Sequence, residues 1–288
     1  MSYAFALIVV SAVFHAVWNL LVKTSDDKVA YNVHIQVATA VFITSYTVFF
    51  FPDAFYFHKP TFIYALLSSF FFALYQHFTA VSYKYADVSL VYPITTSSPF
   101  FIMIWAYFIL DERVTLFGIL GIILVLSGCY IMNITKGKGS KSGMYGILMA
   151  FLAAFLYSFG AMADKMGVAS VNTHLYIMLM ADFMSFYSVM FTIISHRKSV
   201  TLHKKVHVPV QWKLVILGGF AMAASTVTYR LALIDMQISY ASALRQLSSL
   251  FGVLMGIFFL KESYGKQRII GGIVIVAGIM LIRLNLFE

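Results

Sequence analysis

Two short stretches, ILDER at residues 109–113 and FLKES at residues 259–263, lie 150 positions apart and decide how the chain is organised. When the sequence is shifted by 150 residues, segment 83–133 falls on segment 233–283 without a gap. Shared Phe, Leu and Ile mean little in so apolar a chain, whereas shared polar residues and glycines mean more. The chain is therefore an internal duplication. Its most informative identities are Ser89/Ser239, Ser98/Ser248, Glu112/Glu262, Gly121/Gly271 and Gly128/Gly278.

The composition excludes a water-soluble globular protein. Hydrophobic residues make up 61% of the chain, charged residues only 11%, and the mean hydropathy is +0.87. A soluble domain is closer to about half apolar and about a quarter charged. Most of this chain must therefore be dissolved in lipid. Its single cysteine, Cys129, lies within an apolar run, so we expect neither a disulfide framework nor paired thiol chemistry.

Ten apolar runs are long enough to cross a bilayer, for which a helix needs about 20 mainly apolar residues. The breaks between them are short, and the longest, residues 195–211, is a basic loop. We therefore predict an all-α polytopic membrane protein with ten transmembrane helices. The predicted spans are Tyr3–Val22, Tyr31–Phe51, Thr61–Ser82, Asp87–Leu110, Thr115–Ile134, Gly143–Asp164, Thr173–Ser195, Trp212–Ile234, Gln237–Leu260 and Lys266–Arg283.

The odd number of spans in each half determines the symmetry of the duplication. After five crossings the second half begins on the opposite side of the membrane, so we predict two inverted five-helix repeats. We place the first repeat at residues 1–136 and the second at residues 137–288. Inverted repeats with a site at their interface are a recurrent design of secondary transporters, whose halves exchange roles during alternating access.

These features resemble the drug/metabolite transporter superfamily, in particular its ten-helix EamA-type members, over essentially the whole chain. The resemblance rests on the duplication, on the glycine-rich tenth span, on the aromatic and polar residues of the first span, and on a family-like Gly-Glu region. In both copies of that region the glycine is replaced, giving Asp111-Glu112 and Lys261-Glu262. The resemblance implies that spans one, three, four, six, eight and nine surround a central path. It also implies substrates such as amino acids, other metabolites or sugar-linked compounds.

Basic residues are concentrated on one side of the predicted membrane. Fourteen of the 20 Lys and Arg residues lie in or next to the loops that follow odd-numbered spans, whereas four lie on the side of the termini (Lys59, Arg113, Lys165 and Arg283) and two lie deep within spans. The positive-inside rule then puts the termini outside the cytoplasm, whereas the family resemblance implies cytoplasmic termini. The net charge of +9 sits in short membrane-flanking segments and indicates topology, so we expect no nucleic-acid partner. We expect the protein in a bacterial cytoplasmic (inner) membrane.

Arg245, in the stretch SALRQLSS within the ninth span, is the sharpest candidate for a site residue. A charged side chain at mid-membrane costs roughly 3 kcal/mol on insertion scales and usually faces a cavity or a partner. Arginine offers a fixed charge and a planar donor fork that suits a carboxylate or phosphate. We interpret Arg245, with Gln246 beside it, as an anchor for an anionic group of the substrate. The alternatives are a salt bridge to Asp182 and snorkelling toward the interface.

Two further charges lie inside predicted spans. Asp182, near the middle of the seventh span, could pair with Arg245 or Arg230 or carry a coupling proton. Arg230 lies about four residues from the end of the eighth span. It could contribute to the substrate site, or its long side chain could snorkel to the interface.

Polar and aromatic residues of the first span form a stripe on one helical face. His15, Trp18 and Asn19 follow an i, i+3, i+4 spacing, and an offset of 142 places Tyr157 of the sixth span opposite His15. Aromatic walls with a few hydrogen-bonding groups are typical of small-molecule sites, so we predict that this group lines a cavity. The alternative is packing between helices. His15 could also couple transport to protons because imidazole titrates near neutral pH.

The third and fourth spans supply further candidates for the cavity wall. In the fourth, the stretch VYPITTSSP carries two prolines, which remove backbone hydrogen bonds and bend or open a helix. Thr95 is the repeat counterpart of Arg245. We predict a bend that faces the path, with a packing kink as the alternative. The candidates are Tyr75 and Gln76 in the third span and Tyr92, Thr95 and Thr96 in the fourth.

The repeated glutamates, Glu112 and Glu262, follow the ends of predicted helices. A carboxylate in such a place commonly caps a neighbouring helix or anchors the chain at the interface. We therefore expect capping or anchoring for both, and no contact with substrate.

The leading interpretation is a secondary carrier, not an enzyme, that moves a small zwitterionic or anionic metabolite, with an amino acid or a related organic acid as first candidate. The chain has no GxxxxGK[ST] motif, so the energy would come from the substrate gradient, exchange or protons. We expect the lipid bilayer and a small molecule as partners, and no cofactor or metal. The alternatives are a flippase for a lipid-linked sugar and a membrane-embedded enzyme, although the sequence has no HExxH or GxSxG motif.

Overall fold

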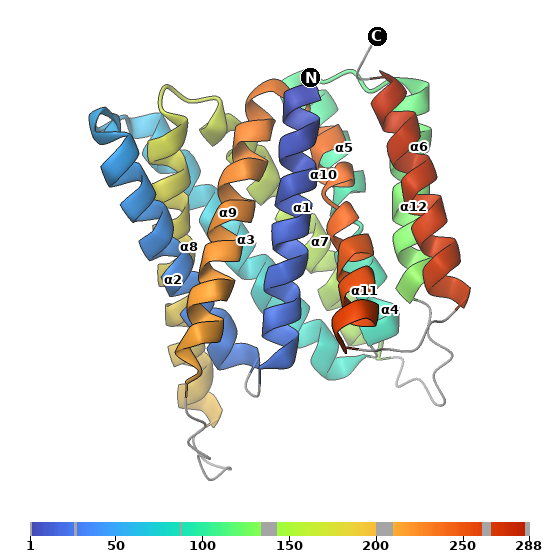
Figure 1. Cartoon of the computed structure of the whole chain (residues 1–288), viewed down its shortest axis with the longest axis horizontal. Helices are drawn as coiled ribbons and strands as arrows, with labels where there is room; N and C mark the ends of the chain where they lie inside the picture. Colours follow the sequence, from blue (N-terminus) through green and yellow to red (C-terminus); the bar gives the residue numbers. More distant parts are fainter. Residues whose placement is uncertain are drawn as a thin grey trace.

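The computed structural model describes residues 2–25, 28–86, 88–133, 143–199, 210–260 and 266–285, and the regular elements among them are helices (Figure 1). The all-α fold predicted from the sequence is confirmed. The elements are α1 (Ser2–Thr24), α2 (Lys28–Phe50), the 3₁₀ helix η1 (Pro52–Ala54), α3 (Lys59–Tyr85), α4 (Val88–Thr95), α5 (Ser98–Leu110), α6 (Leu116–Asn133), α7 (Met144–Val168), α8 (Thr173–Ser199), α9 (Trp212–Asp235), α10 (Ile238–Leu244), α11 (Leu247–Leu260) and α12 (Lys266–Asn285).

The helices account for the ten predicted crossings. Eight helical stretches among the described residues have the length and apolar composition to span a membrane. The other two predicted crossings are α6, whose apolar part Leu116–Met132 is shorter, and α12, which carries basic residues near both ends. The fourth and ninth spans each consist of two consecutive helices, α4–α5 and α10–α11. α1 begins and α12 ends at the same face of the bundle, as ten crossings require (Figure 1).

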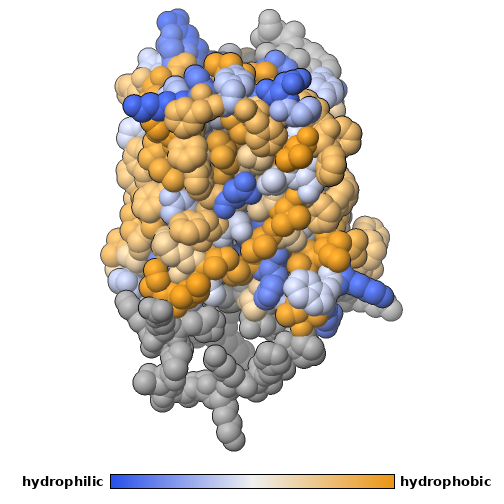
Figure 2. Space-filling view, turned by 90° about the vertical axis from the view of Figure 1, so that its left-hand side faces the viewer, coloured by the Kyte–Doolittle hydropathy of each residue, from blue (hydrophilic) through white to orange (hydrophobic). Residues whose placement is uncertain are grey.

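The outer surface of the bundle is apolar. Figure 2 shows a broad hydrophobic band over one side, interrupted by only a few hydrophilic residues. Large side chains such as Phe49, Phe108 and Phe258 are more than 70% exposed. In water such a surface would be strongly unfavourable, whereas in a bilayer these side chains face acyl chains.

The inversion of the repeats is visible where α6 crosses α12. A Cβ atom on Gly121 would lie 2.8 Å from the carbonyl oxygen of Gly278, and one on Gly128 would lie 2.7 Å from that of Gly271. In the 150-residue register, exchanging the repeats turns each of these contacts into the other. A twofold relation produces such self-complementary contacts, and glycine lets the two backbones approach closely. The two helices are therefore antiparallel counterparts.

The remaining helix pairs follow the same symmetry. α3 packs on α7 as α1 packs on α9, α8 packs on α3 as α2 packs on α9, and α7 packs on α5 as α1 packs on α11. Each helix of one repeat thus packs chiefly on helices of the other. The predicted pair of inverted five-helix repeats is confirmed, and the two repeats form one intertwined bundle.

The fourth span breaks where the sequence predicts a bend. α4 ends at Thr95, and α5 begins at Ser98 with Pro99 in its first turn, where a missing N–H costs nothing. The hydroxyls of Thr95 and Thr96 donate to the Tyr92 carbonyl at 2.9 and 3.0 Å, and that of Ser97 donates to the Ile94 carbonyl at 2.7 Å. These short side chains therefore satisfy backbone groups at the break.

The ninth span breaks at the equivalent position without a proline. α10 ends at Leu244 and α11 begins at Leu247, so Arg245 and Gln246 form the break. Their backbone N–H groups donate to the carbonyls of Ala241 and Ala243. Both fourth-position spans are thus discontinuous, which is typical of transporter helices that line a substrate path.

The end of α5 explains why a glycine suits the Gly-Glu region. Asp111 has a φ of 51°, in the left-handed region, and the Glu112 N–H donates to the Ala106 carbonyl at 3.1 Å. This is the geometry of a helix C-terminus that commonly carries glycine, although aspartate tolerates it better than most residues. The turn directs Glu112 back into the protein, where its side chain is buried.

Candidate substrate site

The helix break between α10 and α11 presents Arg245 to the interior of the bundle. Its Nη2 atom lies 3.4 Å from His15 Nδ1 on α1, and its guanidinium carbon lies 4.3 Å from the centre of the Tyr229 ring on α9. No carboxylate of the described residues lies within ion-pair distance of it. The cation therefore rests against an imidazole and an aromatic face, a weak cation–π arrangement that leaves its donor fork available.

Of the three residues predicted from the first span to line a cavity, His15 and Trp18 lie in the group around Arg245, and Asn19 does not. The rings of His15 and Trp18 lie 4.8 Å apart, and both side chains are half-buried. Trp18 Nε1 is buried and has no hydrogen-bond partner among the described residues. Asn19, in contrast, is exposed and makes no side-chain hydrogen bond in the described part of the chain. The indole N–H is thus a second donor near Arg245 that lacks an acceptor.

The two helix breaks meet each other across the repeat interface. Gln246 Nε2 donates to the Thr96 carbonyl at 3.3 Å, and the hydroxyls of Tyr92 and Ser249 lie 3.4 Å apart. Gln246 and Thr96 are 150 residues apart, so they are repeat counterparts in direct contact. The predicted residues of the fourth and ninth spans are therefore brought together at the two helix breaks. Thr95 itself is buried, and its hydroxyl donates within its own helix.

Tyrosines of α3 and α7 extend this cluster. The rings of Tyr75 and Tyr157 lie 4.9 Å apart, and Tyr157 is close enough to Tyr229 to interact with it electrostatically. Gln76 is half-buried beside Tyr75 and makes no side-chain hydrogen bond within the described part of the chain. We use the name Arg245 cluster for His15, Trp18, Tyr75, Tyr92, Tyr157, Tyr229, Arg245, Gln246 and Ser249.

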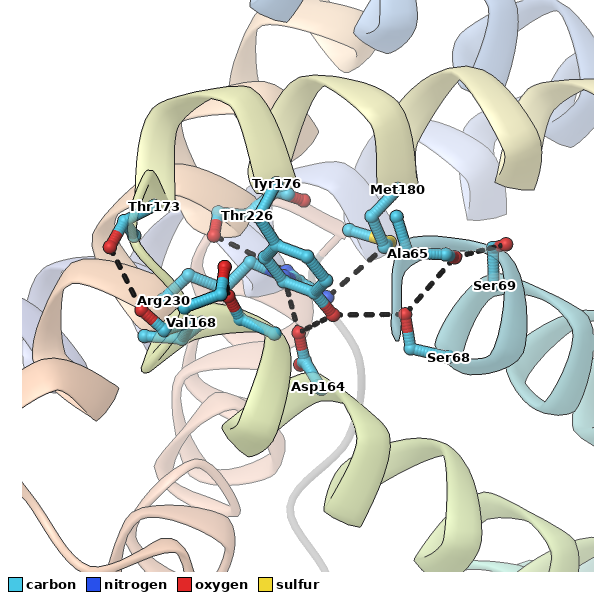
Figure 3. Close-up of polar contacts among 12 residues, drawn as sticks. Ala65, Ser68, Ser69, Asp164, Val168, Thr173, Tyr176, Met180, Thr226 and Arg230 are labelled. Carbon is cyan, nitrogen blue, oxygen red and sulfur yellow. Dashed lines mark hydrogen bonds and ion pairs between the residues drawn. The ribbon is translucent and has the colours of Figure 1, made fainter. Parts of the chain in front are cut away.

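Arg230 is buried within the bundle and does not snorkel toward the membrane interface, contrary to one of the two expectations for it. Its side chain is 6% exposed, and its Nε atom lies 2.9 Å from Oδ1 of Asp164 on α7 (Figure 3). Arg230 also donates to the Thr226 carbonyl and to the Met180 sulfur. Each nitrogen of the guanidinium group has a hydrogen-bond partner within the bundle, so the side chain does not extend to the membrane interface. The expectation of snorkelling was therefore wrong.

Tyr176 completes this network from α8. Its hydroxyl lies 2.7 Å from Asp164 Oδ1 and 2.9 Å from Ser68 Oγ on α3, so it links a carboxylate to a third helix (Figure 3). Gly167 permits this, because any Cβ there would collide with the tyrosine ring. Sequence reasoning missed Asp164 and Tyr176 because Asp164 stood at the predicted end of a span. The continued apolar pattern to Val168 was the available signal.

Asp182 also lacks its expected partner. Its Oδ1 atom accepts a hydrogen bond from Thr44 on α2 at 3.0 Å, and the only ion pair among the described residues joins Arg230 to Asp164. The expectation that Asp182 pairs with Arg245 or Arg230 was therefore wrong, because α8 turns this residue toward α2. Its role as a coupling residue stays a prediction.

Glu112 caps a helix, as predicted, and the helix belongs to the other repeat. Its two carboxylate oxygens accept from the backbone N–H groups of Ile238 and Ser239 at 2.8 and 3.1 Å, and Oε2 accepts from the Ser239 hydroxyl at 2.6 Å. Lys165 donates to the carbonyls of Leu233 and Met236 at the adjoining end of α9. A cavity of about 400 Å³ lies at this end of the bundle, lined among others by Glu112 and Lys165. Glu262 lies outside the described residues.

The fold and the Arg245 cluster together define a class of protein. Two inverted five-helix repeats with discontinuous fourth helices bring polar groups from both repeats to one place inside a membrane bundle. This is the organisation of a membrane transporter. The comparisons with known proteins agree: a model of the EamA-like transporter family matches residues 2–134 and again residues 144–284, and the chain belongs to that family.

Structural comparison supports the fold independently. A protein of known crystal structure superposes with a TM-score of 0.79 at 14% identity, covering 99% of this chain and 98% of that one. At this identity the likeness concerns the fold alone. None of the curated proteins matches the sequence.

Proposed function

We propose that this transporter is a secondary carrier for a small organic anion or zwitterion, such as an amino acid or a related organic acid, working by alternating access of its two repeats. The observation that carries the proposal is Arg245, an intramembrane cation without a carboxylate partner among the described residues. An uncompensated charge in a bundle interior is costly and usually marks a substrate or ion path. A substrate carboxylate would supply the missing counter-charge.

The neighbours of Arg245 support an anionic group. The Trp18 indole N–H is a buried donor without an acceptor in the described chain, and Arg245 Nη2 uses one of its N–H groups on His15 Nδ1 at 3.4 Å. The other N–H groups of Arg245 and the indole N–H, beside aromatic walls, suit a carboxylate attached to a small apolar or aromatic body. An ammonium group, if present, would face the hydroxyls of Tyr92 and Ser249.

Transport into proteoliposomes tests the proposal. Purified protein would be offered labelled acetate, lactate, succinate and glutamate, each with and without a pH gradient. We expect uptake of at least one of these anions, and we expect Arg245→Ala to reduce it by about 100-fold or more, since it removes a charge-assisted bidentate contact. Arg245→Lys keeps the charge but loses the planar fork, so a loss of about tenfold is expected.

Two controls make the result specific. Arg283→Ala removes an equally charged side chain from α12, outside the Arg245 cluster, and should leave uptake within about twofold of the unsubstituted protein. Thermal unfolding of Arg245→Ala should be nearly unchanged, because no buried carboxylate is left unpaired. Normal uptake by Arg245→Ala would overturn the anion-anchor proposal. Failure of all soluble solutes, together with movement of a lipid-linked sugar between leaflets, would favour the flippase.

The energy source and the membrane belong to the same proposal. A carrier without a nucleotide-binding motif would use the substrate gradient, exchange or protons, and His15 and Asp182 are the candidates for proton coupling. Stimulation of uptake by a pH gradient that disappears in Asp182→Asn but not in His15→Asn would assign the coupling to Asp182.

We place the protein in a bacterial cytoplasmic membrane, which fractionation of expressing cells would test.

A further inference from the structure

Glu112 and Lys165 contact the α9–α10 turn at one end of the bundle, apart from the Arg245 cluster. We name these hydrogen bonds the α9–α10 end contact. Glu112 belongs to the α5–α6 connection of the first repeat, and its carboxylate accepts hydrogen bonds from residues at the start of α10 in the second. The contact therefore ties the two repeats together on the face that carries the termini (Figure 1).

Its charges match the helix ends that they meet. Glu112 accepts from the free N–H groups at the start of α10, where the helix dipole favours an anion. Lys165 donates to carbonyls of Leu233 and Met236 at the end of α9, where the dipole favours a cation. Ile238, Ser239 and Met236 are at most 1% exposed. The turn is thus held on both sides by opposite charges, and these three residues are buried although the neighbouring Asp235 is exposed.

A second cross-repeat contact reinforces it. The Tyr240 hydroxyl accepts from the Thr115 N–H at the start of α6 at 3.2 Å. The Tyr240 ring lies against Gly118, where any side chain would collide with it. Three consecutive residues of α10, Ile238, Ser239 and Tyr240, are therefore anchored to the first repeat within a single helical turn.

The short helix α10 links this contact to the substrate site. It begins at Ile238, at the Glu112 carboxylate, and its C-terminal cap is Arg245. Seven residues of α-helix span only about 10 Å, so the two ends move together. The cavity of about 400 Å³ lies outside the contact and is lined by Glu112, Lys165, Ala169 and Asp235. We call this cavity the vestibule.

We propose that the α9–α10 end contact is the closed gate of the substrate path on the face of the termini, and that its release moves α10 together with Arg245. This inference rests on the proposed function, because it assigns the gate of the same path. Opening the gate would require the carboxylate and the ammonium group to leave their helix ends, and both would then be solvated by the vestibule.

Thiol labelling provides the test, because the chain has a single cysteine and Cys129 is 1% exposed. Ser249→Cys places a thiol in the Arg245 cluster, and Ala169→Cys places one in the vestibule. Each would be treated with a charged, membrane-impermeant methanethiosulfonate from the face of the termini. We expect rapid labelling of Ala169→Cys and little labelling of Ser249→Cys. Adding Glu112→Gln should raise the labelling rate of Ser249→Cys by about tenfold or more, as expected for the loss of charge-assisted bonds.

Asp235→Asn is the matched control. Asp235 lines the same cavity and loses the same charge, but it makes no side-chain hydrogen bond among the described residues. It should leave the labelling of Ser249→Cys within about twofold. Unchanged labelling in Glu112→Gln, with normal labelling of Ala169→Cys, would overturn the proposal, and so would an equal increase in Asp235→Asn.

Two further variants keep the test informative if Glu112→Gln does not fold. Ser239→Ala removes only the hydroxyl donor of the contact and should raise labelling by a smaller factor, whereas Lys165→Met should raise it through the other helix end. No increase in either would also overturn the proposal. Labelling needs no substrate, so the gate can fail while Arg245→Ala still abolishes transport. If labelling changed as expected but Arg245→Ala transported normally, the anion-anchor role of Arg245 would be refuted and the gate would stand.

Discussion

Arg230 and Arg245 lie in the same repeat of the same membrane bundle, and they differ in one respect. Arg230 has a carboxylate at 2.9 Å, with a backbone carbonyl and a methionine sulfur satisfying its other donors. Arg245 has an imidazole, a tyrosine face and, among the described residues, no carboxylate. The charge of the first arginine is thus neutralised within the protein and each of its three nitrogens has a partner, whereas the charge of the second faces no carboxylate of the described residues. Inside a membrane, the partner of a charge is a better guide to its role than the charge itself.

Comparison with the other repeat supports this distinction. The offset of 150 places Ala80 opposite Arg230, and the offset of 142 that relates the first and sixth spans places Val22 opposite Asp164, so the first repeat has apolar residues at both positions. The ion pair is therefore an addition within one repeat rather than a requirement of the five-helix unit. Buried pairs of this kind are often no more stable than well-packed apolar residues, although breaking one is costly.

The largest effect expected from this comparison follows from breaking the pair. Arg230→Ala leaves Asp164 buried without its cation and should lower the free energy of unfolding by about 3–5 kcal/mol. Chemical unfolding in detergent, monitored by tryptophan fluorescence, would measure the loss. Arg245→Ala, measured in the same way, should change it by less than about 1 kcal/mol, because no carboxylate loses a partner.

A double substitution sharpens the result. Asp164→Val combined with Arg230→Ala copies the first repeat and removes both charges, so it should recover most of the stability that Arg230→Ala loses. If the double variant were as unstable as the single one, the network would contribute packing that the first repeat does not need, and the comparison between repeats would fail.

A smaller effect is expected from the hydroxyl that completes the network. Tyr176→Phe deletes one group that contacts Asp164 at 2.7 Å and Ser68 at 2.9 Å, and the loss should be about 2 kcal/mol, typical of a hydrogen bond to a charged group. Tyr187→Phe is the control, because its hydroxyl lies on the same helix without a hydrogen-bond partner in the described residues. A change below about 0.5 kcal/mol is expected for it, and equal losses in both variants would contradict the role of the Tyr176 hydroxyl.

The sequence alone was sufficient for the fold because a bilayer leaves few choices. Spanning segments must be helices of nearly fixed length, and an odd number of them per repeat forces inversion. The shared glycines Gly121 and Gly128 marked a helix crossing that the structure contains. The break at Arg245 had no proline to indicate it. Only its register with the proline-containing fourth span pointed to it.

The partners of the intramembrane charges could not be predicted from sequence. Because Asp182, Arg230 and Arg245 lie within apolar spans, each is expected to face a polar partner or a cavity. Which partner it meets depends on how the helices are rotated within the bundle. Asp182 is turned toward Thr44, and Asp164 rather than Asp182 forms the ion pair with Arg230. Lys165 was counted as a loop charge, yet it donates to two carbonyls at the end of α9.

The smallest effect, and the sharpest for the site, comes from giving Arg245 what Arg230 already has. His15→Asp puts a carboxylate on α1 at the position that now lies 3.4 Å from the guanidinium. An internal counter-ion would compete with the substrate anion, so we expect the KM for an anion that the unsubstituted protein carries to rise by about tenfold, equivalent to about 1.4 kcal/mol. His15→Asn has nearly the same shape without the charge and should stay within about threefold. If the two variants transported the anion equally well, a fixed negative charge beside Arg245 would be irrelevant to binding, and the contrast between the two arginines would no longer distinguish a structural charge from a substrate anchor.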